Sequence, residues 1–100
     1  MSNFIRWTDQ AFRELERLPE KLAFEIIRKT DLLSPFPEIG SDLGAHTTAL
    51  VGLRQLIINK RWRVIYEFDA RNSNVWILAI QSCRQKLPTR GSLRKRKDKT

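Results

Sequence analysis

The sequence has 100 residues, which suits one domain that buries roughly two-thirds of its extended-chain surface. Its 19 Lys and Arg residues outnumber its 11 Asp and Glu residues, so the formal net charge is +8. That excess argues against a cationic partner and favours nucleic acids or acidic proteins, although a merely solvated basic surface gives the same count.

Cysteine content and apolar runs indicate the compartment. The one cysteine, Cys83, permits no internal disulfide and no cysteine-rich metal site, so we expect a reducing cytoplasm and no cofactor. The start MSNFIRWTDQ lacks the apolar run and cleavage site of a signal peptide. No apolar run approaches the roughly 20 residues that cross a bilayer. We therefore expect a soluble, cytoplasmic protein without a membrane partner.

The first half of the sequence predicts a short strand and two helices. Residues 3–7 can form the strand, and Thr8 or Asp9 can cap the first helix. Apolar residues then recur at helical spacing, first Ala11, Phe12, Leu15 and Leu18, and later Leu22, Ala23, Ile26, Ile27 and Leu33. Pro19 separates the two runs, and the prolines of LLSPFPEIG end the second. This tight connection predicts an antiparallel helical hairpin.

The second half predicts three strands after a loop over residues 38–50. The strands are VGLRQLII (51–58), RWRVIYEFD (61–69) and NVWILAIQS (74–82). Their short polar connections are typical of hairpin turns, so the strands should form an antiparallel meander. The order β-α-α-β-β-β predicts an α+β fold, with the helical hairpin on one face of the sheet.

The C-terminal stretch RGSLRKRKDKT is basic and almost free of apolar residues. Such a composition is typical of disorder. We therefore expect a folded domain over residues 1–88 and a disordered basic tail over residues 89–100.

The turn after the first strand of the meander decides which side chains share a face. If Asn59 and Lys60 are its two central residues, Arg54, Arg61 and Arg63 lie on one face. The opposite face is then apolar and packs on the helices; it carries Leu53, Ile57, Trp62, Val64, Tyr66 and Phe68. Converging guanidinium groups on the open face would suit phosphate oxygens, and they would equally suit plain solvation.

Few side chains are suited to proton transfer. RNA cleavage needs a proton acceptor and a proton donor, and arginine is a poor acceptor. His46 lies in the loop, and Tyr66 belongs to the apolar face. Trp76 shares strand parity with Arg84 and can stack a base, although it can equally be a core residue.

The order of these elements, together with PEIG, GLRQL, RWRVIYEFD and the closing WILAIQSCRQ, resembles the RelE/ParE superfamily of bacterial toxins. The resemblance covers about residues 4–85. It implies the fold described above and a growth-regulating toxin of a type II toxin–antitoxin system, of the kind that also stabilises plasmids. It also implies a cognate antitoxin, usually encoded beside the toxin.

The resemblance implies site residues and two alternative activities. RelE-like members cleave mRNA on the ribosome, and ParE-like members inhibit DNA gyrase without nuclease activity. Arg63, Arg84 and Arg54 match or approximate basic positions of RelE-like members and become the candidate catalytic residues. The flanking candidates for binding nucleic acid or another target are Arg61, Lys60 and Trp76.

Two departures from the RelE-like pattern bear on the choice between the activities. Leu56 stands where a second basic residue is expected, and no Tyr or His follows Arg84. The charge and the arginine cluster nevertheless favour a ribosome-dependent endoribonuclease as the first hypothesis. Gyrase inhibition is the second, and a non-catalytic nucleic-acid-binding module is the third.

Overall fold

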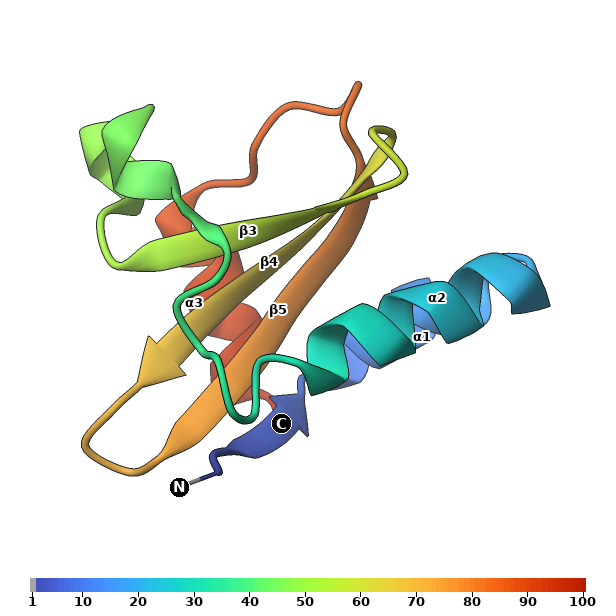
Figure 1. Cartoon of the computed structure of the whole chain (residues 1–100). Coiled ribbons are helices and arrows are strands. Elements are labelled where there is room, and N and C mark those ends of the chain that lie inside the picture. Colours follow the sequence, from blue (N-terminus) through green and yellow to red (C-terminus); the bar gives the residue numbers. More distant parts are fainter. Residues whose placement is uncertain (1) are drawn as a thin grey trace.

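The computed structural model describes residues 2–100 and contains one five-stranded sheet with helices packed on it (Figure 1). The strands are β1 (Phe4–Trp7), β2 (Ser41–Asp42), β3 (Leu53–Ile58), β4 (Trp62–Asp69) and β5 (Asn74–Ser82). Their order is β1-β5-β4-β3-β2; β1 runs parallel to β5, and the other neighbours are antiparallel. The predicted N-terminal strand, meander and α+β fold are confirmed, and β2 is an addition within the expected loop.

The predicted helical hairpin is also confirmed. It consists of α1 (Asp9–Glu16) and α2 (Glu20–Asp31), which lie side by side in Figure 1. The buried Thr8 caps α1: its hydroxyl accepts a hydrogen bond from the Ala11 amide at 3.2 Å and donates to the Ile77 carbonyl at 3.1 Å. This cap therefore fixes the start of α1 to β5. Two 3₁₀ turns, η1 (Leu43–Ala45) and η2 (Thr48–Leu50), lie between β2 and β3.

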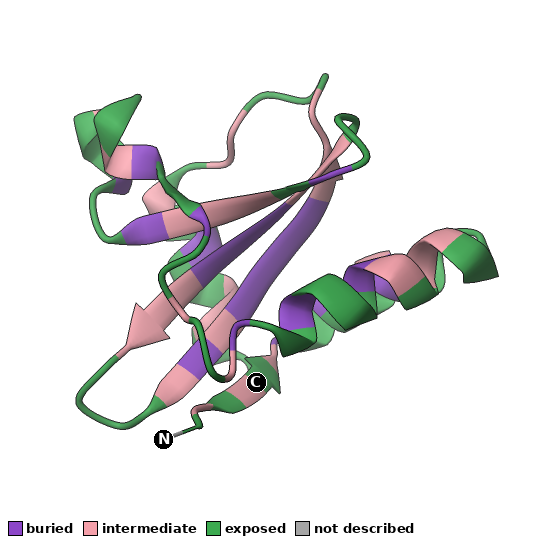
Figure 2. Ribbon diagram, viewed as in Figure 1, coloured by how far each residue is buried: buried purple, intermediate pink, exposed green. Residues whose placement is uncertain are grey.

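Buried side chains form one cluster on each face of the sheet, and the central strands carry most of them (Figure 2). The cluster under the helical hairpin contains Ala11, Leu15, Ile26, Leu33, Ile58, Val64, Tyr66, Val75, Ile77 and Ile80. Trp62 and Phe68 pack against it, which confirms the predicted core face of β4. The cluster on the other face contains Leu43, Leu50, Leu53, Ile65, Leu78, Ala79 and Leu93. Leu53 therefore belongs to the opposite face from the one expected.

The C-terminal segment differs from the disordered tail expected for residues 89–100. Arg90–Asp98 form helix α3, which lies on the face of the sheet opposite the hairpin (Figure 1). The Thr89 hydroxyl caps the helix by accepting a hydrogen bond from the Ser92 amide at 3.1 Å. Leu93 is 1% exposed and packs into the second apolar cluster. One buried leucine and a set of polar contacts therefore dock a helix that shows no apolar periodicity.

Within residues 2–100, no helix is both long enough and apolar enough to cross a bilayer.

Tyr66 holds the loop that follows α2 against β4. Its hydroxyl donates to the Pro37 carbonyl at 2.8 Å and accepts from the Gly40 amide at 2.9 Å. A Cβ atom built on Gly40 would lie 2.6 Å from the Tyr66 hydroxyl oxygen and 2.6 Å from the Gln55 carbonyl oxygen. Glycine is therefore required at this position because of the close approach of β3 and β4, not because of a turn.

Gly40→Ala should lower the free energy of unfolding by about 1–3 kcal/mol, because the methyl group must displace backbone atoms of β3 or the Tyr66 ring. Urea unfolding followed by tryptophan fluorescence measures the change. Gly91→Ala is the control, since its Cβ would meet nothing within 4 Å. Equal stability of the Gly40→Ala variant and the parent would contradict the close approach.

Leu93→Ala should cost about 2–4 kcal/mol of stability, because it removes the one fully buried side chain of α3. Thermal unfolding measures this loss as a lower melting temperature. The neighbouring Arg94 is exposed, so Arg94→Ala should change stability by no more than about 0.5 kcal/mol. If both variants melt like the parent, α3 is not docked on the sheet in solution.

Candidate functional site

The turn between β3 and β4 contains one residue more than expected. Ile58 pairs with Trp62, so residues 59–61 form the turn. Asn59 and Lys60 have φ angles of 53° and 63°, and the Arg61 amide donates to the Ile58 carbonyl at 3.1 Å. Arg61 is therefore a turn residue and not the first residue of the strand.

The extra turn residue places Arg54 and Arg63 on opposite faces of the sheet. Arg54 pairs with Tyr66, on the side of the helical hairpin, and Arg63 pairs with Ile57, on the side of α3. A shift of one residue in register moves every side chain of a strand to the other face. The expected common face of Arg54, Arg61 and Arg63 is therefore wrong.

Arg54 stabilises the loop after α2. Its Nη1 donates to the Gly40 carbonyl at 2.8 Å and to the Glu38 carbonyl at 3.2 Å, and its Nη2 lies 3.6 Å from the Glu38 carboxylate. These contacts occupy much of its donor capacity. The structure thus does not bring Arg54 to the other candidate catalytic residues.

Arg63 lies in a polar row that crosses three strands. Its Nη1 donates to Gln55 Oε1 at 3.3 Å, and it pairs with Gln81 on β5. Its Nη2 donates to the Cys83 carbonyl at 2.9 Å, while Gln81 Nε2 donates to the Lys86 carbonyl at 3.3 Å. Arg63 therefore anchors the connecting segment (residues 83–89) that leads from β5 to α3.

Two atoms in this row lack partners among the described residues. Arg63 Nε and Gln81 Oε1 are buried and make no hydrogen bond. Sequence reasoning missed both glutamines, Gln55 and Gln81, because an uncharged polar residue at one strand position gives no distinctive signal. The strand register places both glutamines on the same face of the sheet as Arg63.

The exposed basic candidates gather at the tip of the sheet. The Cys83 amide donates to the Arg61 carbonyl at 2.8 Å and so joins the end of β5 to the turn. This contact closes a shallow groove, the basic tip groove, which is lined by Lys60, Arg61, Trp62, Ser82, Cys83 and Arg84. Lys60, Arg61 and Arg84 are exposed, and the lining contains neither a histidine nor a carboxylate. The groove can attract anionic groups but offers no ordinary acid–base pair.

Trp76 lies far from this groove. Gln81, the partner of Arg63, is five residues further along β5, or roughly 16 Å at the usual strand rise. The Trp76 ring instead has the Lys97 ammonium group 5.3 Å and the Arg6 guanidinium group 5.8 Å from its centroid. The structure therefore separates Trp76 from the candidate site residues Arg63 and Arg84, and places it beneath α3.

The two side chains considered for proton transfer also lie outside the groove. Tyr66 is fully buried on the hairpin face, and this burial raises the pKa of its hydroxyl above the ordinary value of 10.0, although the Gly40 hydrogen bond partly opposes it. His46 follows η1 as its C-cap residue. Neither residue lines the basic tip groove.

The fold is similar to that of toxin–antitoxin proteins of known structure. A chain of the RelBE2 complex of Mycobacterium tuberculosis matches with a TM-score of 0.72 and 24% identity, over 82% of this chain and 99% of that chain. A mutant of E. coli RelE in the free state matches with a TM-score of 0.70 and 14% identity, over 84% and 86%. The archaeal RelE–RelB complex from Pyrococcus horikoshii matches with a TM-score of 0.57 and 16% identity, over 86% and 100%. At these identities, the similarity shows the fold.

Sequence comparison identifies the family. No curated protein matches the chain in sequence. The profile of the family described as "ParE toxin of type II toxin-antitoxin system, parDE" matches residues 5–87, which include both helices of the hairpin and the whole meander. The chain therefore belongs to the ParE toxin family and is the toxin of a type II toxin–antitoxin system.

Proposed function

We propose that this toxin arrests growth by binding DNA gyrase, as ParE-like toxins do, and that the basic tip groove is part of the contact surface. The observation that carries the proposal is the composition of the groove. It presents three exposed cations, Lys60, Arg61 and Arg84, and no carboxylate or histidine. Such a surface is suited to electrostatic binding rather than to proton transfer. The family match to ParE toxins supports the same activity.

The distribution of the arginines also favours binding over catalysis. An RNA-cleaving site needs a proton acceptor and donor beside the cations that stabilise the transition state. Arg54 lies on the other face, and Arg63 is tied to the connecting segment. Leu56, at the position where a second basic residue was expected, packs under the helical hairpin.

Ribosome-dependent mRNA cleavage is the second candidate, and one observation favours it. Arg63 Nε and Gln81 Oε1 are buried without partners, as expected for groups that bind a substrate when the connecting segment moves aside. The similarity of the fold to E. coli RelE supports this candidate too. A nuclease of this kind would act on ribosome-bound mRNA, with Arg63 and Arg84 supplying positive charge. Membership of a toxin family argues against the third hypothesis, a non-toxic binding module.

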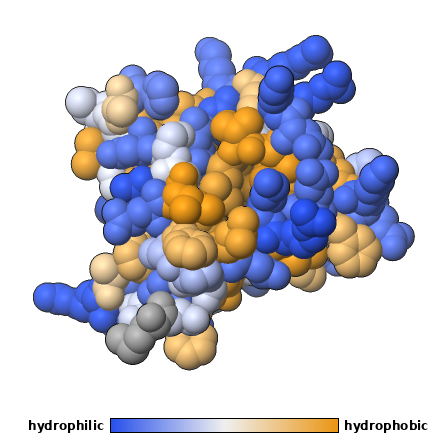
Figure 3. Space-filling model, viewed as in Figure 1, coloured by the Kyte–Doolittle hydropathy of each residue, from blue (hydrophilic) through white to orange (hydrophobic). Residues whose placement is uncertain are grey.

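The partner that neutralises the toxin should be a cognate antitoxin, since the structural relatives include toxin–antitoxin complexes. Large apolar side chains are exposed on the helical hairpin and the loop after it: Phe24 is 62%, Phe36 57% and Ile39 51% exposed. Figure 3 shows apolar side chains at the centre of this view of the molecule, framed by hydrophilic ones. Exposed patches of this kind mark protein–protein contacts, and the antitoxin is the candidate occupant.

Arg61→Glu should reduce toxicity by about tenfold or more, because a charge reversal at the groove replaces an attraction to the target with a repulsion. Growth after induction of the variant measures the loss. Arg71→Glu is the matched control: Arg71 is also an exposed arginine of a β-turn, but it lies between β4 and β5 at the other end of the strands. It should be as toxic as the parent.

The activity itself is tested in parallel on purified components. The parent should inhibit supercoiling by gyrase and leave ribosome-bound mRNA intact, and Arg61→Glu should lose the inhibition. mRNA cut at codons by the parent, with supercoiling unaffected, would overturn gyrase inhibition and establish the nuclease. Equal toxicity of Arg61→Glu and Arg71→Glu would remove the basic tip groove from the target surface.

A further inference from the structure

A second basic groove lies between α1 and α3, apart from the basic tip groove. Its main lining residues are Gln10 and Arg13 from α1, and Ser92, Lys95, Arg96 and Lys99 from α3 and its C-cap. None of these residues belongs to the candidate site described above.

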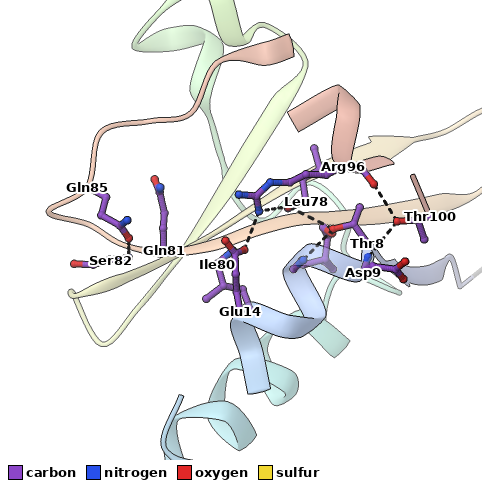
Figure 4. Close-up of polar contacts among 12 residues, drawn as sticks. Thr8, Asp9, Glu14, Leu78, Ile80, Gln81, Ser82, Gln85, Arg96 and Thr100 are labelled. Carbon is purple, nitrogen blue, oxygen red and sulfur yellow. Dashed lines mark hydrogen bonds and ion pairs between the residues drawn. The ribbon is translucent and has the colours of Figure 1, made fainter. Parts of the chain in front are cut away.

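Polar contacts at the edge of β5 hold the two helices beside each other (Figure 4). Arg96 Nη1 donates to Glu14 Oε1 at 2.8 Å and to the Leu78 carbonyl at 3.0 Å. Glu14 Oε1 also accepts from the Ile80 amide at 3.0 Å, on the part of β5 that lies beyond its pairing with β1. The groove therefore has rigid walls, built by residues other than its exposed cations.

The exposed cations of the groove form no ion pair. Among residues 2–100, the ion pairs involve Arg54, Arg96 and Lys97, so Arg13, Lys95 and Lys99 form none. Lys95 and Lys99 are four residues apart, close enough on a helix surface to repel each other. Asp9 is the one acidic residue that lines the groove. Positive charges from two helices distant in sequence thus outnumber the single carboxylate in the groove, and a bound anion would balance the excess.

The chemistry of the lining favours a nucleic acid over an acidic protein. Among the residues that the structure describes, no apolar side chain lines the groove. Protein–protein interfaces usually centre on apolar and aromatic residues, whereas nucleic-acid interfaces are polar and strongly positive. Gln10 and Ser92 add hydrogen-bond donors of the kind that contact phosphate oxygens.

Gly91 widens the groove at the start of α3. It lines the groove in the first turn of α3. Neither packing nor a positive φ requires it, because a Cβ atom there would meet nothing within 4 Å. The missing side chain opens the first turn of α3 to close approach, although the Thr89 hydroxyl already caps the Ser92 amide.

We propose that the α1–α3 groove binds the phosphodiester backbone of a nucleic-acid duplex, with Arg13, Lys95 and Lys99 each contacting a phosphate. This binding is independent of base sequence, because every contact is to the backbone. It does not depend on whether gyrase or mRNA is the target of the toxin.

The test is the salt dependence of binding by the full-length protein to a labelled DNA duplex and to an RNA duplex of the same sequence, followed by fluorescence anisotropy. The groove variant carries Arg13→Gln, Lys95→Gln and Lys99→Gln. On DNA, the slope of a plot of the logarithm of the binding constant against the logarithm of salt concentration should become less steep by about 2.7, because three phosphate contacts are lost. A loss on one duplex alone identifies which nucleic acid the groove takes, and a loss on both identifies recognition of the backbone in either.

The control variant carries Lys21→Gln, Arg28→Gln and Lys29→Gln, three exposed cations of α2, and so loses the same charge. It should keep the parent slope. If both variants lose slope equally, only the net charge matters and the proposal is overturned. It is also overturned if the groove variant keeps its DNA and RNA binding but loses binding to poly-glutamate, which would make the groove a site for an acidic protein.

A single substitution keeps the test valid if the triple variant is unstable. Lys99 follows the last helical residue of α3, so the Lys99→Gln variant should keep the melting temperature of the parent. Its slope on DNA should fall by about 0.9, the value of one phosphate contact. An unchanged slope in this folded variant would remove Lys99 from the site and overturn the proposed three-phosphate contact.

Discussion

The pairing of Ile58 with Trp62 across a three-residue turn is the constraint on which the arrangement of charge depends. Because side chains alternate between the faces of a strand, this register directs Arg54 toward the loop after α2 and Arg63 toward the segment after β5. Each arginine fastens irregular backbone to the sheet by hydrogen bonds to carbonyl groups. Arg54 and Arg63, which the sequence suggested as site residues, therefore also stabilise the fold.

The polar junction between Glu14, Arg96 and β5 has a comparable role on the other side of the molecule. The Arg96 and Glu14 side chains are only 13% and 21% exposed, and both also bond backbone groups of β5. Loss of one member would leave the other charge poorly solvated, which is costly even where the intact pair adds little stability. Together with the buried Leu93, this junction holds a strongly basic helix on a basic protein.

The surfaces proposed for binding consist of side chains that remain exposed after these structural contacts are made. Exposed cations are left at the basic tip groove and in the α1–α3 groove, while exposed apolar side chains remain on the helical hairpin. Under the proposed function, the apolar patch on the hairpin contacts the antitoxin and the basic tip groove contacts the cellular target, so the two partners would use distinct surfaces. The buried, unpartnered atoms of Arg63 and Gln81 are the feature that keeps a nuclease as the alternative.

The sequence by itself determined the helical hairpin and the meander, because apolar periods of helices and strands are local signals and the Thr8 cap is adjacent to its helix. The resemblance of its motifs, in their order along the chain, indicated the superfamily. The sequence did not determine the length of the turn at residues 59–61, because a turn of two or of three residues is compatible with this sequence. Asn59 and Lys60 both adopt positive φ angles, and neither is the glycine that would have indicated them. The sequence also did not predict helix α3. One leucine among basic residues shows no period, and the carboxylates that hold Arg96 and Lys97 lie 82 and 30 residues away in the chain. Only the tertiary structure brings those charges together, and Arg54 and Arg63 are likewise held by contacts 14 and 20 residues away in the chain.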